Sequence, residues 1–261
     1  MKQMDIIDFL PLWIVYLLTV VLGLLAVEVG FRLGGYWKKI HPDEQEGHIG
    51  TMIAATLGLW AFLLAFFVGI ATNRFDARRE LVLAEANSIG TTYLRAGYLP
   101  EPYAGRSREL LREYAGERLK LVELDTYLAA RQRSEEIQPQ LWAMAQELAA
   151  GQPANPVLAL YVDALNQTID LHTSRITALT SARIPFTIYV GMYLVGMLGL
   201  MMLGFQSGVN GKRDMIVTLV LILIFTSVMV LVIDLDRPWG GLLRVNQQPM
   251  IDLVNSFASF K

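Results

Sequence analysis

Four long apolar runs alternate with polar stretches along this chain of 261 residues. They cover residues 9–31, 49–72, 184–205 and 215–233, and the only charged residue inside them is Glu28. A helix of about 20 mostly apolar residues crosses a bilayer, and only helices satisfy a single segment's backbone in hydrocarbon. The pattern therefore predicts four transmembrane helices. The first run is longer than the apolar part of a signal peptide, so we expect it to remain as an anchor.

Between the second and third runs, Arg, Glu, Leu and Ala recur with helical spacing. The first helix of this region is expected to continue the second span as far as Arg95, where "YLPEP" ends it. Further helices are expected at about 104–124, at about 134–150 and from Pro156 toward the membrane, with Pro185 kinking or restarting the last.

The predicted fold class is therefore an all-α membrane protein, with four transmembrane helices and a helical soluble region between the second and third. We expect three parts: residues 1–72 with two spans, residues 73–183 as the soluble region, and residues 184–261 with two spans and a short tail. Four spans place both termini and residues 73–183 on one side. The larger number of Lys and Arg residues near the membrane lies on that side and predicts that it is cytoplasmic, although their density in the short loops favours the opposite orientation.

Composition excludes several functions. The net charge of -2 and the absence of a basic stripe argue against a nucleic-acid partner. The chain has no cysteine, and its three histidines are scattered, so no metal site is expected. No phosphate-binding loop, nucleophile elbow or H-x-x-x-H spacing is present. We expect neither enzymatic activity nor a cofactor.

One face of the second span is aromatic and then polar. Gly58, Phe62, Phe66, Ile70 and Asn73 recur at steps of three or four residues, which places them on one stripe. Such a stripe is usually explained by packing or by contact with lipid. The functional alternative is a pore neck of Phe62, Phe66 and Ile70, which gates by dewetting and opens onto a polar vestibule at Asn73 and Arg74.

The stretch "FLLAFFVGIATNRF" resembles the second membrane helix of bestrophins, the pentameric anion channels, in which two phenylalanines four residues apart line the pore neck before an Arg-Trp pair. Phe62 and Phe66 take the neck positions, and Arg74-Phe75 takes the place of Arg-Trp. Gly58 stands where a larger aliphatic residue is expected. More broadly, residues 63–100 and "DLDRPWGGLLRVNQQP" are similar to a bacterial membrane family described as bestrophin-like. The resemblance implies a homo-oligomer, with five copies suspected, in a bacterial inner membrane.

Two charged features lie within or next to the spans. Glu28 and Arg32 are an intramembrane pair with the favourable i,i+4 orientation, for which a structural role is the simpler interpretation. The same segment, Gly30 to Gly34, has the spacing of close helix contact. Asp234 and Asp236 end the last span. They supply too few ligands for a calcium cage, so an interfacial turn with an Asp236-Arg237 network is favoured over a cation site.

Two hypotheses remain open. The first is an oligomeric channel, selective for small inorganic anions because the ring edges of phenylalanine carry partial positive charge. The second is a non-conducting membrane scaffold or sensor, whose helical region binds a partner.

Overall fold

The computed structural model describes residues 10–41, 49–151 and 155–259, and all their regular elements are helices. The chain divides into two compact units. Unit 1 consists of residues up to 74 together with residues 183–237, and unit 2 consists of residues 75–182 together with residues 238–261. The segment after 237, which the sequence groups with the last spans, thus belongs to unit 2.

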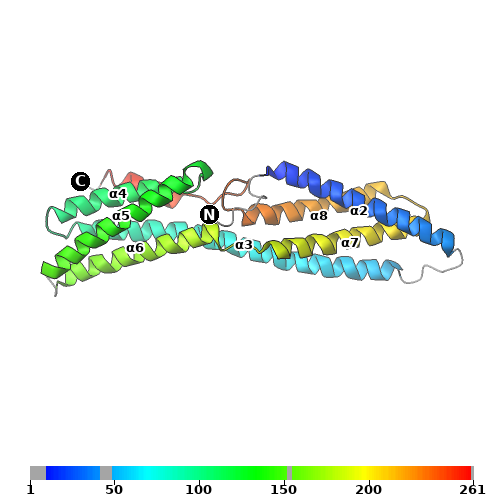
Figure 1. The fold of residues 1–261 in the computed structure, drawn as a ribbon, viewed down its shortest axis with the longest axis horizontal. Coiled ribbons are helices and arrows are strands. Elements are labelled where there is room, and N and C mark those ends of the chain that lie inside the picture. The colour runs from blue at the N-terminus through cyan, green and yellow to red at the C-terminus, as the bar shows by residue number, and fades with distance from the viewer. Residues whose placement is uncertain (1–9, 42–48, 152–154, 260–261) are drawn as a thin grey trace. The chain divides into compact units, whose positions relative to one another are not determined.

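Unit 1 contains four helices that lie side by side (Figure 1). They are α2 (Leu12–Ile40), the first half of α3 (Ile49–Ala96), α7 (Phe186–Asn210) and α8 (Met215–Asp236). Within the described parts of the chain, these are the helices long and apolar enough to cross a membrane. The expected all-α membrane fold with four spanning helices is confirmed.

Helices α2 and α7 pack so closely that their backbones touch. The contact is made by glycines on both helices: Gly30, Gly34, Gly204 and Gly208. A Cβ atom added to Gly204 would lie 2.1 Å from the carbonyl oxygen of Val27, and one added to Gly30 would lie 1.9 Å from that of Met201. The small-residue spacing of Gly30 and Gly34 therefore does mark a close helix contact, because only glycine leaves room for the facing carbonyls.

Gly204→Ala is expected to lower the stability of unit 1 by about 1–3 kcal/mol, because the added methyl group must push two backbones apart. Gly191→Ala on the same helix is the matched control, since a Cβ there meets no atom within 4 Å. Thermal unfolding in a mild detergent measures both variants. Equal melting temperatures for the two would show that α2 and α7 do not depend on this contact.

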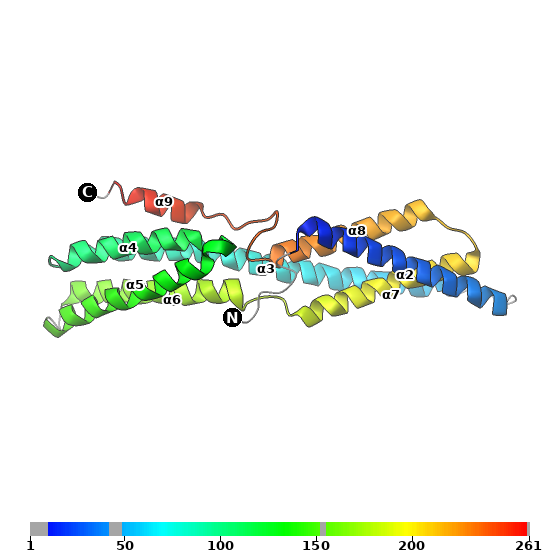
Figure 2. The ribbon, with the colours of Figure 1, turned by 45° about the horizontal axis from the view of Figure 1, so that its top comes forward.

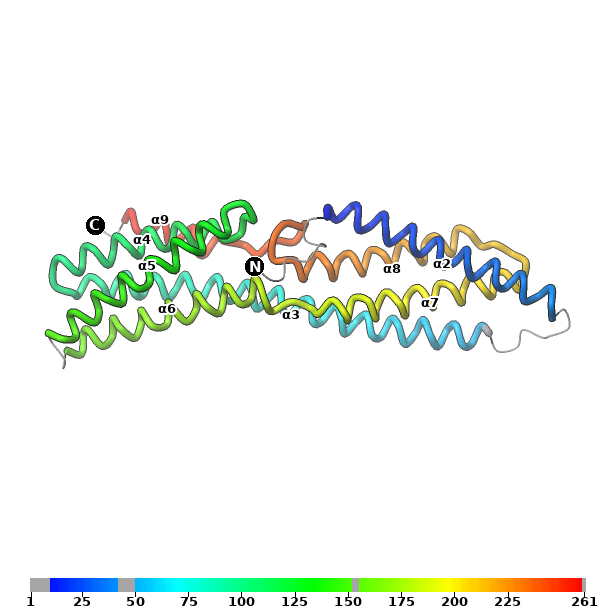
Figure 3. Tube along the Cα trace, in the orientation of Figure 1, coloured from blue at the N-terminus to red at the C-terminus, as the bar shows by residue number. Residues whose placement is uncertain are grey.

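Unit 2 is a helical bundle with an apolar core. It contains the second half of α3 with α4 (Tyr103–Lys120), α5 (Leu124–Gly151), α6 (Pro156–Thr180) and α9 (Gln248–Ser256). Fully buried side chains of its core include Ile89, Leu111, Ile137 and Leu165. Figure 3 shows the backbone after α8 running back along this bundle to form α9, whose Met250 is completely buried.

The expected helix boundaries in unit 2 hold except at the end of α4 and the start of α5. As predicted, α3 continues beyond the span and ends at Ala96, and α6 starts at Pro156. The Asn155 carboxamide oxygen caps α6 by accepting hydrogen bonds from the amides of Val157 and Leu158. The predicted end of the second helix near 124 and the predicted start of the third near 134 are both wrong: α4 ends at Lys120, and α5 already begins at Leu124.

Candidate functional site

The stripe on α3 is the face that unit 1 leaves uncovered. Phe62 and Phe66 are 59% and 61% exposed, and Ile70 is also exposed. The two phenylalanine rings meet edge to face, with centroids 4.9 Å apart and planes at 74°. Together with Ala65, Gly69 and Asn73 they line a shallow open hollow formed by α3 alone. The structure thus places the three predicted neck residues on one free surface.

The opposite face of α3 is anchored in unit 1, which fixes the direction of the stripe. Trp60 is buried, and its indole Nε1 donates a hydrogen bond of 3.2 Å to the carbonyl oxygen of Met192 on α7. Its ring also lies 4.6 Å from that of Phe225 on α8. Phe67 is 3% exposed and packs edge to face against Tyr189. These contacts leave Phe62 and Phe66 pointing away from the rest of unit 1.

The predicted vestibule residues differ in their surroundings. Asn73 is exposed and lines the same hollow as the phenylalanines, whereas Arg74 is half-buried. On an ideal helix the step from Asn73 to Arg74 turns the side chain by roughly 100°. Gly58, one turn before Phe62, has no atom within 4 Å of a hypothetical Cβ. It therefore contributes backbone rather than a side chain to the stripe.

The Glu28–Arg32 pair has a third member. The carboxylate of Glu28 accepts a 2.8 Å hydrogen bond from Nε of Arg32, as the i,i+4 spacing predicts. Its other oxygen lies 3.1 Å from a guanidinium nitrogen of Arg213, in the loop between α7 and α8. Arg213 is far away in sequence, so no local pattern identifies this contact. The carboxylate of Glu28 thus contacts two arginines, Arg32 and Arg213.

Asp234 and Asp236 are buried at the end of α8. A carboxylate oxygen of Asp236 accepts a 3.1 Å hydrogen bond from the amide of Ile184, just before α7, and another lies 3.7 Å from Nε of Arg183. Among the described residues, no three His, Cys, Asp or Glu side chains are grouped to hold a metal ion. Asp236 thus ties the end of α8 to the chain entering α7.

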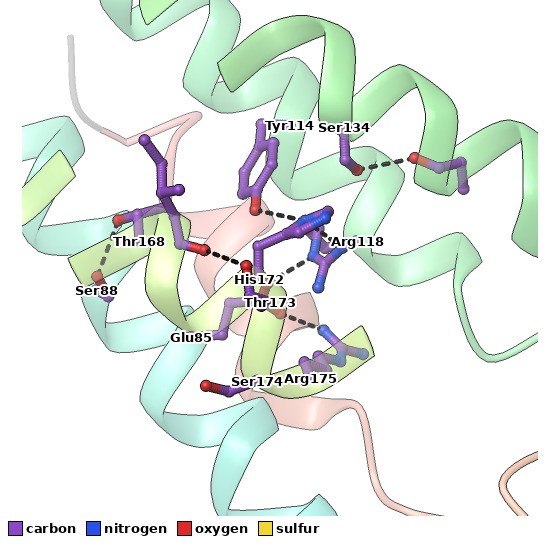
Figure 4. Close-up of polar contacts among 12 residues, drawn as sticks. Glu85, Ser88, Tyr114, Arg118, Ser134, Thr168, His172, Thr173, Ser174 and Arg175 are labelled. Atoms are coloured by element: carbon purple, nitrogen blue, oxygen red, sulfur yellow. Dashed lines mark hydrogen bonds and ion pairs between the residues drawn. The ribbon is translucent and has the colours of Figure 1, made fainter. Parts of the chain in front are cut away.

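A buried ionic network in unit 2 has no signature in the sequence. Figure 4 shows Glu85 of α3, Arg118 of α4, and His172 and Arg175 of α6 meeting in the bundle. The Glu85 carboxylate lies 2.6 Å from Nε of Arg118 and 2.5 Å from Nη1 of Arg175, and all three side chains are buried. Arg118 Nη1 lies 2.9 Å from His172 Nδ1. Two buried guanidinium groups therefore share one carboxylate.

Burial and the neighbouring charges shift the pKa values of His172 and of the adjacent Tyr114. Burial, together with the positive charge of Arg118, lowers the pKa of His172 to about 4. Burial raises the pKa of Tyr114, whose hydroxyl lies 3.2 Å from His172 Nδ1, to about 12. Both groups are therefore neutral at pH 7, and the network carries its excess positive charge on the arginines.

This neutral histidine makes unit 2 sensitive to acid. The folded-state pKa of about 4 lies below the usual 6.5, so the unfolded chain binds more protons between these values. The contribution of neutral His172 to the free energy of unfolding is complete above pH 6.5 and is lost as the pH falls toward 4. The total loss is about 3 kcal/mol. Melting temperatures measured from pH 7.5 to pH 4 should fall less steeply for His172→Gln. Parallel curves for both proteins would rule out this role.

Comparison with known proteins shows which family and which solved structures this chain resembles. A family model described as a Bestrophin-like domain matches residues 16–250. Among solved structures, a mutant of a bacterial bestrophin homologue from Klebsiella pneumoniae aligns with a TM-score of 0.69 at 13% identity, covering 94% of this chain and 97% of that chain. Another crystal structure of a bacterial bestrophin homologue from Klebsiella pneumoniae aligns with a TM-score of 0.62 at 15% identity, covering 95% and 96%.

Identities this low show similarity of fold alone. No curated protein matches the chain. The family model, however, extends from α2 through both units to α9. Because it matches most of the length, the chain belongs to the Bestrophin-like family.

Proposed function

We propose that several copies of this chain assemble around an axis as an ion channel whose neck is lined by Phe62, Phe66 and Ile70. The observation that carries the proposal is the uncovered stripe on α3, whose direction is fixed by Trp60 and Phe67 on the opposite face. In a membrane these side chains face either lipid or a pore that several copies of the chain enclose. The channel-type fold of the family favours the pore. A ring of phenylalanines in the neck then excludes water and blocks the passage of ions until the neck widens.

One chain supplies only one copy of the stripe and cannot enclose a pore, so the proposal requires a ring. The resemblance to bestrophins implies five chains. Native mass spectrometry in mild detergent and in nanodiscs is expected to show a single closed oligomer with a mass of about five chains. A monomer in both environments would contradict the channel, while leaving the fold of the chain unaffected.

Two features bear on the permeant ion. The edges of the phenylalanine rings carry partial positive charge and favour anions in the neck, and the exposed amide of Asn73 follows them. We propose small inorganic anions on this ground. Cations are the second candidate, because Asp76 and Glu80 are exposed on α3 three and seven residues after Asn73. Rings of carboxylates favour cations.

Purified protein in planar bilayers under a KCl gradient distinguishes these candidates. A reversal potential near the equilibrium potential of chloride supports anions, and one near that of potassium supports cations. In the second case, Asp76→Asn with Glu80→Gln should move the reversal potential toward zero. No current under any tested condition would leave the non-conducting scaffold as the better explanation.

We further propose that the channel lies in a bacterial inner membrane, with both termini and residues 73–183 in the cytoplasm. The greater number of basic residues near the membrane on that side supports this orientation. A reporter fused to the C-terminus tests it: activity confined to an external compartment would reverse the orientation.

A further inference from the structure

A hollow in unit 1 lies apart from the stripe on α3. It is bounded by one face of α2, the first turns of α8 and the loop before α8. Its apolar lining consists of Leu24, Val27, Phe31, Met215, Ile216 and Leu219. Arg213, Glu28, Asp214, Ser207 and Thr218 supply the polar groups. The hollow therefore combines an apolar lining with charged groups.

The hollow exists because two helices diverge. Helices α2 and α8 touch at Gly23, where a Cβ would lie 3.0 Å from the side chain of Ile222. Toward the start of α8 they separate, as Figure 2 shows. From Ile222 back to Met215 the helix rises about 10 Å. The opening is thus a groove about two helical turns long on the surface of the membrane unit.

Arg213 dominates the polar groups of the groove. Its guanidinium lies 3.9 Å above the ring of Phe31 and 3.1 Å from the carboxylate of Glu28. Glu28 already pairs with Arg32, so two guanidinium groups share one carboxylate. Their side chains are 48% and 79% exposed. Since a guanidinium has five N–H donors, both retain donors for a further acceptor.

The charge around the groove favours an anion. Among the lining residues, Arg213 is opposed by Glu28 and Asp214. Two further cations lie beside the lining, Arg32 bound to Glu28 and Lys212 next to Arg213 in the chain, so the five groups together carry one positive charge in excess. Arginine binds phosphate oxygens with two parallel hydrogen bonds, and the adjoining apolar groove suits hydrocarbon better than water. The phospholipids of a membrane have both a phosphate group and hydrocarbon chains.

We propose that this groove binds an anionic phospholipid, with one acyl chain between α2 and α8 and its phosphate on Arg213 and Arg32. The proposal stands independently of ion conduction. It predicts that the lipid stabilises the pairing of α2 with α8. The same basic groups would repel a cationic amphiphile.

Native mass spectrometry tests the proposal on the full-length protein. The protein is mixed with equal amounts of phosphatidylglycerol and phosphatidylcholine of identical acyl chains, and the lipids retained per chain are counted. Phosphatidylglycerol should be retained in preference. Arg213→Gln should lower its retention about fivefold, the effect of one basic group near a lipid surface. Lys39→Gln removes a charge from the same end of α2 outside the groove, and should have little effect.

A second pair of variants tests the acyl chain. Thr218→Trp fills the groove and should abolish the preferential retention, whereas Val217→Trp, at a neighbouring exposed position outside the lining, should not. Equal retention of both lipids, or unchanged retention in Arg213→Gln, would overturn the proposal. Competition by inorganic phosphate with no effect of Thr218→Trp would indicate a free anion instead. A loss of oligomer mass in Thr218→Trp with lipid retention intact would assign the groove to a second copy of the chain.

Discussion

Phe62→Ala and Phe66→Ala channels are expected to pass ions under conditions in which the wild-type channel is closed. Each substitution removes a ring from the exposed stripe on α3, and in an oligomer it removes one ring from every copy. A dewetted neck blocks ions because they cannot shed their water, so widening it lets water enter and lowers the barrier steeply. Single-channel recordings or anion flux in liposomes measure the change.

Leu63→Ala and Phe67→Ala are the matched controls. Each lies one residue beyond a stripe position, turned by roughly 100° around the helix. Phe67 is buried against Tyr189, so its truncation should cost about 3–5 kcal/mol of stability while leaving conductance unchanged. The pair Phe66→Ala and Phe67→Ala thus separates a pore residue from a packing residue of the same type.

Cysteine substitution offers a second measurement, which does not require a change in conductance. Cysteines at 62 and 66 should react with a water-soluble thiol reagent when the channel is open, and the natural chain contributes no background because it contains no cysteine. Reaction only at 63 and 67, or equal leak in all four alanine variants, would show that the stripe faces lipid or protein.

The membrane fold could be predicted because its cause is local. A charge-free run such as 215–233 is incompatible with water over its whole length, and α8 (Met215–Asp236) follows it closely. Continuation of α3 past Asn73 follows from the absence of proline. The stripe was visible for the same reason, since the steps between Phe62, Phe66 and Ile70 depend only on helix geometry.

What could not be predicted depends on contacts distant in sequence. The start of α5 is not predicted, because the turn at 121–123 contains neither proline nor glycine. The buried residues Tyr127 and Ala130 show that α5 extends well before 134. Helix α9 has nine residues and depends on burial of Met250 against other helices. Arg213 meets Glu28 only after α7 and α8 have packed on α2.

The network around Glu85 is the clearest case, because its residues come from three helices and the spacing along any one helix does not reveal their pairing. On the sequence, Glu85 belongs to a charged helical stretch. In the structure it is completely buried between Arg118 and Arg175. Arg175 also donates a hydrogen bond of 2.7 Å through Nη2 to the Gln247 side chain, which precedes α9. The carboxylate thus organises four segments of unit 2.

Glu85→Gln is accordingly expected to destabilise unit 2 by about 3–5 kcal/mol, since it keeps the shape of the side chain but leaves two buried guanidinium groups without a counter-charge. Glu109→Gln is the control: its partner Arg106 lies 2.6 Å away, but both are exposed, so the loss should be about 0–1 kcal/mol. Thermal unfolding in detergent measures both variants.

A second substitution separates lost charge balance from general damage. Arg118→Met in the Glu85→Gln background removes one uncompensated buried charge while retaining an apolar stem, so it should restore part of the lost stability rather than add to the loss. Arg118→Met alone leaves Glu85 paired with Arg175 and removes the guanidinium group next to His172. It should destabilise unit 2 less than Glu85→Gln does. Additive losses in the double variant, or a Glu85→Gln protein as stable as Glu109→Gln, would mean that the guanidinium groups find water or other acceptors and that the network does not hold the bundle together.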